Sequence, residues 1–99
     1  MSKADEILKD WEKRRPVEVR IGDVEIVLEK YFPGEWVWKK SSHIVVTAKI
    51  LAIHPQFRLG IMTVPTVSGK TVKGVYINNI VKAIEFIKQY EDWKNGKRS

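Results

Sequence analysis

The amino-acid sequence predicts an α+β fold, in which a three-stranded antiparallel sheet is packed by helices on one face. Three consecutive segments rich in β-branched and aromatic residues stand in the middle of the chain, and short connections join them, which favours an antiparallel meander. Segments with apolar residues at helical spacing stand before and after these strands, an order typical of α+β folds rather than of wound parallel sheets. A chain of 99 residues suits one domain of ordinary size.

The first segment, residues 2–14, is predicted to form an extra N-terminal helix. Ser2 is a favourable N-cap, and Pro16 ends the helix because proline disfavours helical geometry in the residue before it. Apolar residues recur on one face of this helix: Ile7, Leu8 and Trp11. We therefore divide the chain into a helical extension, residues 1–16, and a main domain, residues 17–94.

The main domain is expected to begin with a short extended link at residues 17–21. A second helix follows from about Gly22 to Phe32 and is terminated by Pro33-Gly34. Its apolar stripe consists of Val24, Val27, Leu28 and Tyr31. A long helix is also predicted from about Lys73 onward, and its aliphatic stripe consists of Ile77, Ile80, Val81, Ile84 and Ile87.

Three strands are predicted between these helices, over residues 35–40, 43–50 and 58–64. Ser41-Ser42 is the turn between the first two strands, and the second strand either ends at Ile50 or continues through Leu51–Ile53. A polar loop is predicted at residues 66–72, before the last helix.

The first predicted strand carries two tryptophans at alternate positions, Trp36 and Trp38, whose side chains therefore share one sheet face. Aromatic rings on a sheet can stack on unpaired bases of RNA. The favoured interpretation is that these rings instead pack against a helix as part of the core.

The composition limits the classes of function. The net charge of +6, from 18 basic and 12 acidic residues, favours a polyanionic partner such as nucleic acid. The chain has no cysteine, which excludes disulfides and thiolate chemistry. No apolar stretch reaches the roughly 18–20 residues that a membrane-spanning helix needs, and the N-terminus lacks the apolar segment of a signal peptide. We expect a cytoplasmic protein that makes no membrane contact.

A series of short motifs resembles one known family. The motifs are Lys-Lys-Ser-Ser-His-Ile-Val-Val at residues 39–46, Met-Thr-Val-Pro at 62–65, Ser-Gly-Lys at 68–70 and Lys-Gly at 73–74. They resemble the HicA (YcfA-like) family of toxin–antitoxin modules over about residues 17–88. The resemblance implies a fold like the double-stranded-RNA-binding domain, cleavage of messenger RNA, and a HicB-like antitoxin as protein partner.

The chain departs from this family pattern at two places. The family's glycine before Ser-His is Ser41 here, and serine adopts a positive φ less readily than glycine. The family often has a histidine shortly after its Val-Pro pair, where this chain has Thr66 and Val67. These departures concern the activity more than the fold, because the principal histidine, His43, is retained.

His43 is the candidate catalytic residue. An imidazole exchanges a proton near neutral pH, and the attacking group in RNA cleavage can be the RNA's own 2′-hydroxyl, so a general acid or base suffices without a metal or other cofactor. The other candidate residues would bind RNA: lysines by holding the phosphate, and serines by orienting the substrate. These residues are Lys39, Lys40, Ser41, Ser42, Lys70 and Lys73. His54 precedes Pro55 in a connection and is interpreted as structural, and no pair of residues has the spacing of a zinc site.

Three functions remain open at this point. The first is a metal-independent toxin ribonuclease in which His43 acts. The second is an RNA-binding module without turnover, which recognises the shape and backbone of a duplex. The third is a protein-interaction domain whose positive charge serves solubility. Cleavage of RNA indicates the first function, and salt-dependent RNA binding without cleavage indicates the second. The absence of both leaves the third.

Overall fold

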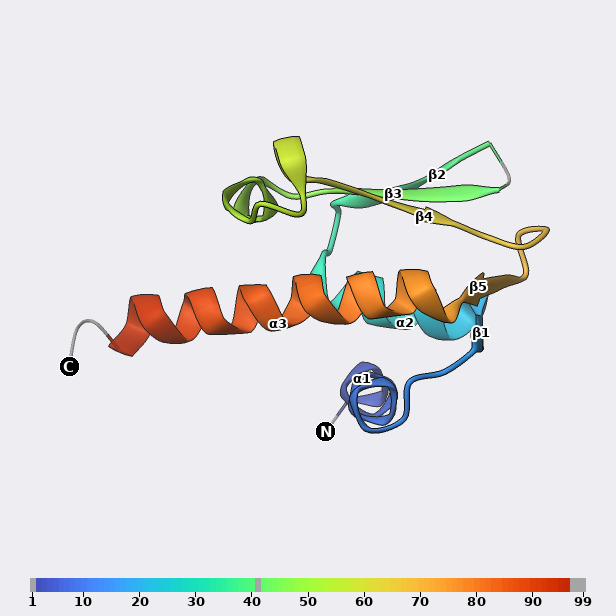
Figure 1. The fold of residues 1–99 in the computed structure, drawn as a ribbon, viewed down its shortest axis with the longest axis horizontal. Coiled ribbons are helices and arrows are strands. Elements are labelled where there is room, and N and C mark those ends of the chain that lie inside the picture. The colour runs from blue at the N-terminus through green and yellow to red at the C-terminus, as the bar shows by residue number, and fades with distance from the viewer. Residues whose placement is uncertain (1, 41, 97–99) are drawn as a thin grey trace.

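The chain folds into three stacked layers, seen in a computed structural model that describes residues 2–40 and 42–96. The three-stranded sheet is one layer, helices α2 and α3 form the next, and α1 lies on the far side of these helices from the sheet (Figure 1). The helices and strands in chain order are α1 (Lys3–Lys13), β1 (Glu18–Arg20), α2 (Ile21–Tyr31), β2 (Trp36–Lys39), β3 (His43–Thr47), β4 (Ile61–Pro65), β5 (Thr71–Lys73) and α3 (Gly74–Gly96).

The predicted α+β fold class is confirmed. Strands β2, β3 and β4 form an antiparallel sheet in that order, with β3 in the centre. Alternate residues of each strand face the helices, and the buried ones are Ile44, Val46, Met62 and Val64. The opposite face, which we call the outer face, carries exposed residues at the intervening positions, including His43, Thr47 and Thr63. Helices therefore cover only one side of the sheet (Figure 1).

The predicted helical stripes form the other half of the core. Val24, Val27 and Leu28 of α2 are buried, as are Ile77, Ile80, Ala83 and Ile84 of α3. Strands β2, β3 and β4 follow α2 and precede β5 and α3, which is the order of helices around three strands that the sequence predicts.

Helix α1 forms where the sequence predicts it, and it packs on the helical layer through Leu8 and Trp11, both buried. Its N-cap is Ser2, whose Oγ accepts a hydrogen bond from the Asp5 backbone N–H at 3.2 Å. This hydroxyl satisfies one of the backbone donors that every helix N-terminus leaves open.

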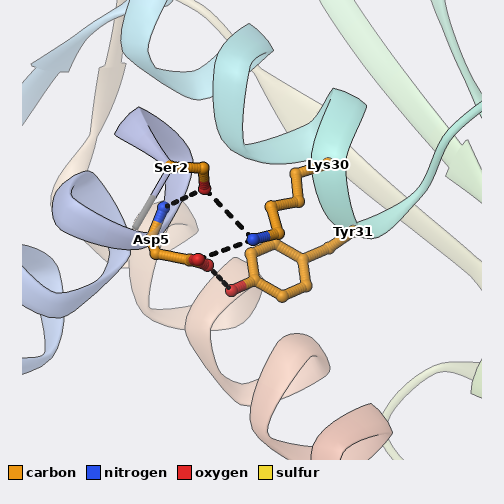
Figure 2. A network of polar contacts seen from close by, with 4 residues as sticks. All are labelled: Ser2, Asp5, Lys30 and Tyr31. Atoms are coloured by element: carbon orange, nitrogen blue, oxygen red, sulfur yellow. Dashed lines mark hydrogen bonds and ion pairs between the residues drawn. The ribbon is translucent and has the colours of Figure 1, made fainter.

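A polar network attaches the start of α1 to the end of α2 (Figure 2). Lys30 Nζ donates to Asp5 Oδ2 at 2.6 Å and to Ser2 Oγ at 3.1 Å, and the Tyr31 hydroxyl donates to Asp5 Oδ1. The Lys30 ammonium and the Tyr31 hydroxyl lower the pKa of Asp5, because both favour its charged form. Burial, and then the hydrogen bond to Asp5, raises the pKa of Tyr31 to about 12.

A second sheet was not predicted. The expected link at residues 17–21 contains β1, and the end of the expected loop at residues 66–72 enters β5, which pairs antiparallel with β1. Val19 and Val72 are directly opposite each other and both are buried. The loop prediction was wrong here because a three-residue strand leaves almost no local periodicity, and its partner is far away in the sequence.

The connection from β3 to β4 also differs from the prediction. The strand expected to reach Ile50 ends at Thr47, and two 3-10 turns, η1 (Lys49–Ile53) and η2 (Arg58–Gly60), precede β4. Continued strand alternation would place Leu51 on the outer face, yet Leu51 is fully buried, so the chain must leave the strand to bury it. At Gly60 (φ +71°) a Cβ would lie 2.5 Å from the Ala48 carbonyl oxygen, so only glycine permits this close approach.

Candidate functional site

The turn between β2 and β3 holds the largest group of candidate residues. Lys39 and His43 are opposite each other in the β-ladder, so the chain turns between them. Lys40 takes the left-handed conformation there, with φ of 55°. The position equivalent to the family glycine, Ser41, lies outside the described residues. The left-handed backbone of this turn thus falls on a lysine, whose side chain is exposed.

His43 stands exposed at the first position of β3. Its neighbour Ile44 faces the core, so alternation places the imidazole on the outer face, with Lys39 opposite on β2 and Pro65 opposite on β4. The hydroxyl of Ser42 lies 2.9 Å from His43 Nδ1. When Nδ1 carries the ring proton and donates it to this hydroxyl, Nε2 is left unprotonated and able to accept a proton.

The loop after β4 lies beside this turn. Thr66 donates two hydrogen bonds to the Ser42 carbonyl oxygen, from its backbone N–H at 2.9 Å and from its Oγ1 at 2.8 Å. The same hydroxyl accepts from the Gly69 N–H at 3.1 Å. Thr66 therefore ties the loop that contains Lys70 to Ser42, the residue before His43. Nothing in the local sequence pattern predicted this positioning role.

The structure distributes the predicted lysines over two places. Lys39 and Lys40 flank His43 directly, and Lys70 ends the loop that Thr66 fixes, where its carbonyl oxygen accepts from the Ile21 N–H at 2.9 Å. Lys73 instead lies on β5, opposite Glu18 in the two-stranded sheet. We define the basic end as Lys39, Lys40, Ser42, His43 and Lys70.

The two tryptophans of β2 face the helices and take no part in the outer face. The Trp36 indole N–H donates to Glu29 Oε1 at 3.1 Å, and the Trp38 indole N–H donates to Glu25 Oε2 at 2.9 Å. Both rings are partly buried against the core. The interpretation as core residues is confirmed, and the Glu25 and Glu29 carboxylates accept hydrogen bonds from the indoles on the inner side of the sheet.

The charge is distributed unevenly along the chain in a way that composition alone did not reveal. No Asp or Glu occurs between Glu35 and Glu85, a segment that contains the whole three-stranded sheet and both of its loops. The basic residues of that segment are Lys39, Lys40, Lys49, Arg58, Lys70, Lys73 and Lys82. The carboxylates are therefore confined to the helical layers, β1 and the chain positions that flank the sheet. Near His43, a polyanion that approaches the outer face meets no negative side chain, because the carboxylate that alternation places on this face, Glu35, lies at the opposite end of β2.

His54 behaves as a structural residue, as predicted. Its Nδ1 accepts a hydrogen bond from the Gln56 N–H at 3.0 Å. Its ring lies 5.2 Å from the Phe57 ring and 4.9 Å from that of Phe86, which it meets edge-on. His54 thereby attaches the β3–β4 connection to α3.

Comparison with protein-family models, with curated proteins and with solved structures gave no match to this chain. Within the described residues, no three His, Asp or Glu side chains gather in a way that would hold a metal ion. None of the helices described is both long and apolar enough to cross a membrane. The fold and site define a small basic α+β protein whose sheet presents a histidine beside a lysine, with a second lysine in the adjoining turn.

Proposed function

We propose that this chain is a ribonuclease that binds RNA at its basic end and cleaves it without a metal, with His43 as general acid or base. The observation that carries the proposal is the position of His43, which stands exposed beside Lys39 at the end of the outer face away from Glu35. Lysine ammonium groups are phosphate ligands, and the lack of negative charge lets the polyanion approach closely.

The proposed reaction uses the substrate's own nucleophile. His43 removes the proton of an RNA 2′-hydroxyl, the oxygen forms a bond to the adjacent phosphorus, and the bond from phosphorus to the 5′-oxygen breaks. The leaving oxygen takes a proton from water or from the imidazolium. Lys39 and Lys70 stabilise the charge that develops on the phosphoryl oxygens. Ser42 keeps the His43 ring oriented through the contact at Nδ1.

The resemblance to the HicA family extends the proposal to substrate and partner. Messenger RNA is then the substrate, and a HicB-like antitoxin is the protein that restrains the activity. The order α2, β2, β3, β4, α3 and the place of His43 at the start of the central strand support this reading.

The second candidate function is RNA binding without cleavage. It is favoured by the surroundings of the imidazole, since the one polar contact recorded for it within the described residues is the Ser42 hydroxyl. Many catalytic histidines are oriented and made more basic by a carboxylate, and none stands on this sheet. On this alternative the lysines of the basic end bind the backbone, and His43 is dispensable.

The test compares the wild-type protein with His43→Ala on a long single-stranded RNA in EDTA, by denaturing gel and by a binding assay. We expect the wild type alone to fragment the RNA and both proteins to bind it. Thr47→Ala is the matched control, because Thr47 is the exposed residue on the same face at the other end of β3. Binding without cleavage by either protein would support the second function instead. Absence of both would exclude an RNA-directed role under these conditions.

A further inference from the structure

We propose that β4 pairs with the β4 strand of a second copy of this chain, so that the two three-stranded sheets become one continuous sheet. This inference is independent of the proposed function. It rests on three properties of β4: the direction of its backbone groups, its lack of charge, and its ability to pair with itself.

The backbone of β4 presents an open edge. Antiparallel partners alternate between hydrogen-bonded and non-hydrogen-bonded pairs. The Thr66 N–H donates to the Ser42 carbonyl oxygen, and the Ala48 N–H donates to the Gly60 carbonyl oxygen. These two hydrogen-bonded pairs lie one position beyond each end of the β3–β4 ladder and keep its register. Alternation between them makes Ile44–Val64 and Val46–Met62 the hydrogen-bonded pairs. Ile61, Thr63 and Pro65 therefore direct their backbone groups away from β3, and no other described strand lies on that side.

This edge also lacks the features that keep edge strands from pairing. Natural sheets protect their edges with charged side chains, prolines or bulges. The opposite edge strand, β2, has Lys39 and Lys40 at one end and Glu35 at the other. No charged residue occurs from Leu59 through Gly69, a range that contains all of β4. The one protective residue is Pro65, at the end of the strand.

The strand is complementary to itself about Thr63. An antiparallel pairing centred there places Thr63 opposite Thr63 of the second copy, as a pair that exchanges two hydrogen bonds. Ile61 then meets the second copy's Pro65, whose carbonyl accepts from the Ile61 N–H, while the missing N–H of proline stops the ladder from extending further. Such an arrangement has the two-fold symmetry of a closed dimer. Ile61, whose side chain is 43% exposed in the monomer, gains an apolar neighbour.

Electrostatics favours this edge over the outer face as the place where two copies meet. Two outer faces stacked on each other would bring the lysines of the β2–β3 turns together, with Glu35 at the far end of each β2 as the carboxylate on that face. Edge pairing places the uncharged strands at the centre and keeps the lysines of the β2–β3 turn on the far edges. Both outer faces then lie on the same side of the joined sheet, and the basic ends stay open.

The proposal is tested by measuring solution mass with light scattering, across a wide range of concentrations, for the wild type and three variants. We expect the wild type to approach twice the chain mass of 11.5 kDa as concentration rises. Thr63→Lys should remain a monomer, because it sets two ammonium groups on residues about 5.5 Å apart at Cα. Thr63→Pro should also be a monomer, since it removes the central donor without removing a bond within the chain's own sheet.

The matched control is Thr47→Lys, which adds the same charge to the same face but on the central strand β3, and it should dimerise like the wild type. Amide hydrogen exchange locates the interface, because the Ile61 and Thr63 amides should be protected only at high concentration. A wild type that stays monomeric throughout overturns the proposal. A dimer that survives both Thr63 variants, or fast exchange at these two amides in the dimer, overturns it as well.

Discussion

At the scale of single residues, the contact between α1 and α2 depends on one carboxylate. Asp5 accepts hydrogen bonds from Lys30 and Tyr31 and lies one turn from the cap residue Ser2 (Figure 2). Its lowered pKa means that the folded protein prefers the charged form more strongly than the unfolded chain does. The folded state is therefore stabilised by Asp5 wherever the carboxyl is ionised in both states.

This dependence predicts the behaviour of Asp5→Asn. An aspartate with a lowered pKa contributes stability at neutral pH, and this contribution falls as the pH drops below the unfolded value of about 3.9. We expect the variant to be less stable than the wild type at pH 7 and to approach it in acid. Urea unfolding of both proteins at several pH values measures the difference. A difference in the free energy of unfolding that stays constant down to the lowest pH would show that the charge of Asp5 does not stabilise the fold. Glu6→Gln, on an exposed neighbour in α1, is the control.

At the scale of elements, the start of α3 is fixed by close packing against the segment that leads into β1. The Gly74 N–H donates to the Val17 carbonyl oxygen at 2.7 Å, and a Cβ at Gly74 would lie 2.0 Å from the Pro16 carbonyl oxygen. No side chain fits that space unless the backbone moves. This contact sets where α3 begins relative to the two-stranded sheet.

Gly74→Ala is therefore expected to destabilise the fold, by about 1–3 kcal/mol as is typical of overpacking. Gly22→Ala is the matched comparison, because a Cβ there meets nothing within 4 Å and alanine favours a helix by up to about 1 kcal/mol over glycine. Free energies of unfolding in urea should move in opposite directions for the two variants. Equal changes in the free energy of unfolding for the two variants would contradict the packing argument.

Elements with a clear local period were predictable from sequence, and those that depend on distant partners were not. The stripes that include Leu28 and Ile84 located α2 and α3, because a helix face that is buried has apolar residues every three or four positions. Strand β5 was missed because it is three residues long and its partner, β1, lies far away in the sequence. The end of β3 was misplaced because Leu51 turns inward, which strand alternation does not foresee.

In the candidate site, too, residues close together in the sequence were predicted, and contacts between distant positions were not. His43 and its neighbours in the β2–β3 turn were found because they are adjacent in sequence. The role of Thr66 was missed, since its contact with Ser42 joins positions 24 residues apart. The absence of acidic residues between Glu35 and Glu85 was visible in the sequence, but it became meaningful only when that segment proved to contain one whole layer of the fold.

At the scale of the whole molecule, charge is separated between layers, with the carboxylates of α1 and α2 on one side and an acid-free sheet on the other. On the proposed function, RNA binding should weaken steeply as salt rises, because the lysines displace condensed counterions. The outer face, rather than the net charge, should determine the strength of this dependence.

Two lysine variants test this expectation. Lys39→Ala should reduce the slope of log affinity against log salt by roughly 0.7 for single-stranded RNA, the value of one phosphate contact. Lys9→Ala removes the same charge from an exposed position of α1 and should leave the slope unchanged. Filter binding or fluorescence anisotropy at several salt concentrations gives both slopes. Equal reductions would show that only net charge matters.

The two-stranded sheet has a consequence for the order in which the chain folds. Arg20 pairs with Thr71, so the β1–β5 ladder closes a loop of about fifty residues around α2 and the three-stranded sheet. Closing so long a loop carries a large entropic penalty before any contact compensates for it. The segments inside the loop meet over much shorter separations and are expected to assemble first. Pairing of β1 with β5 then completes folding. A nascent chain cannot form this two-stranded ladder until Lys73 has been synthesised.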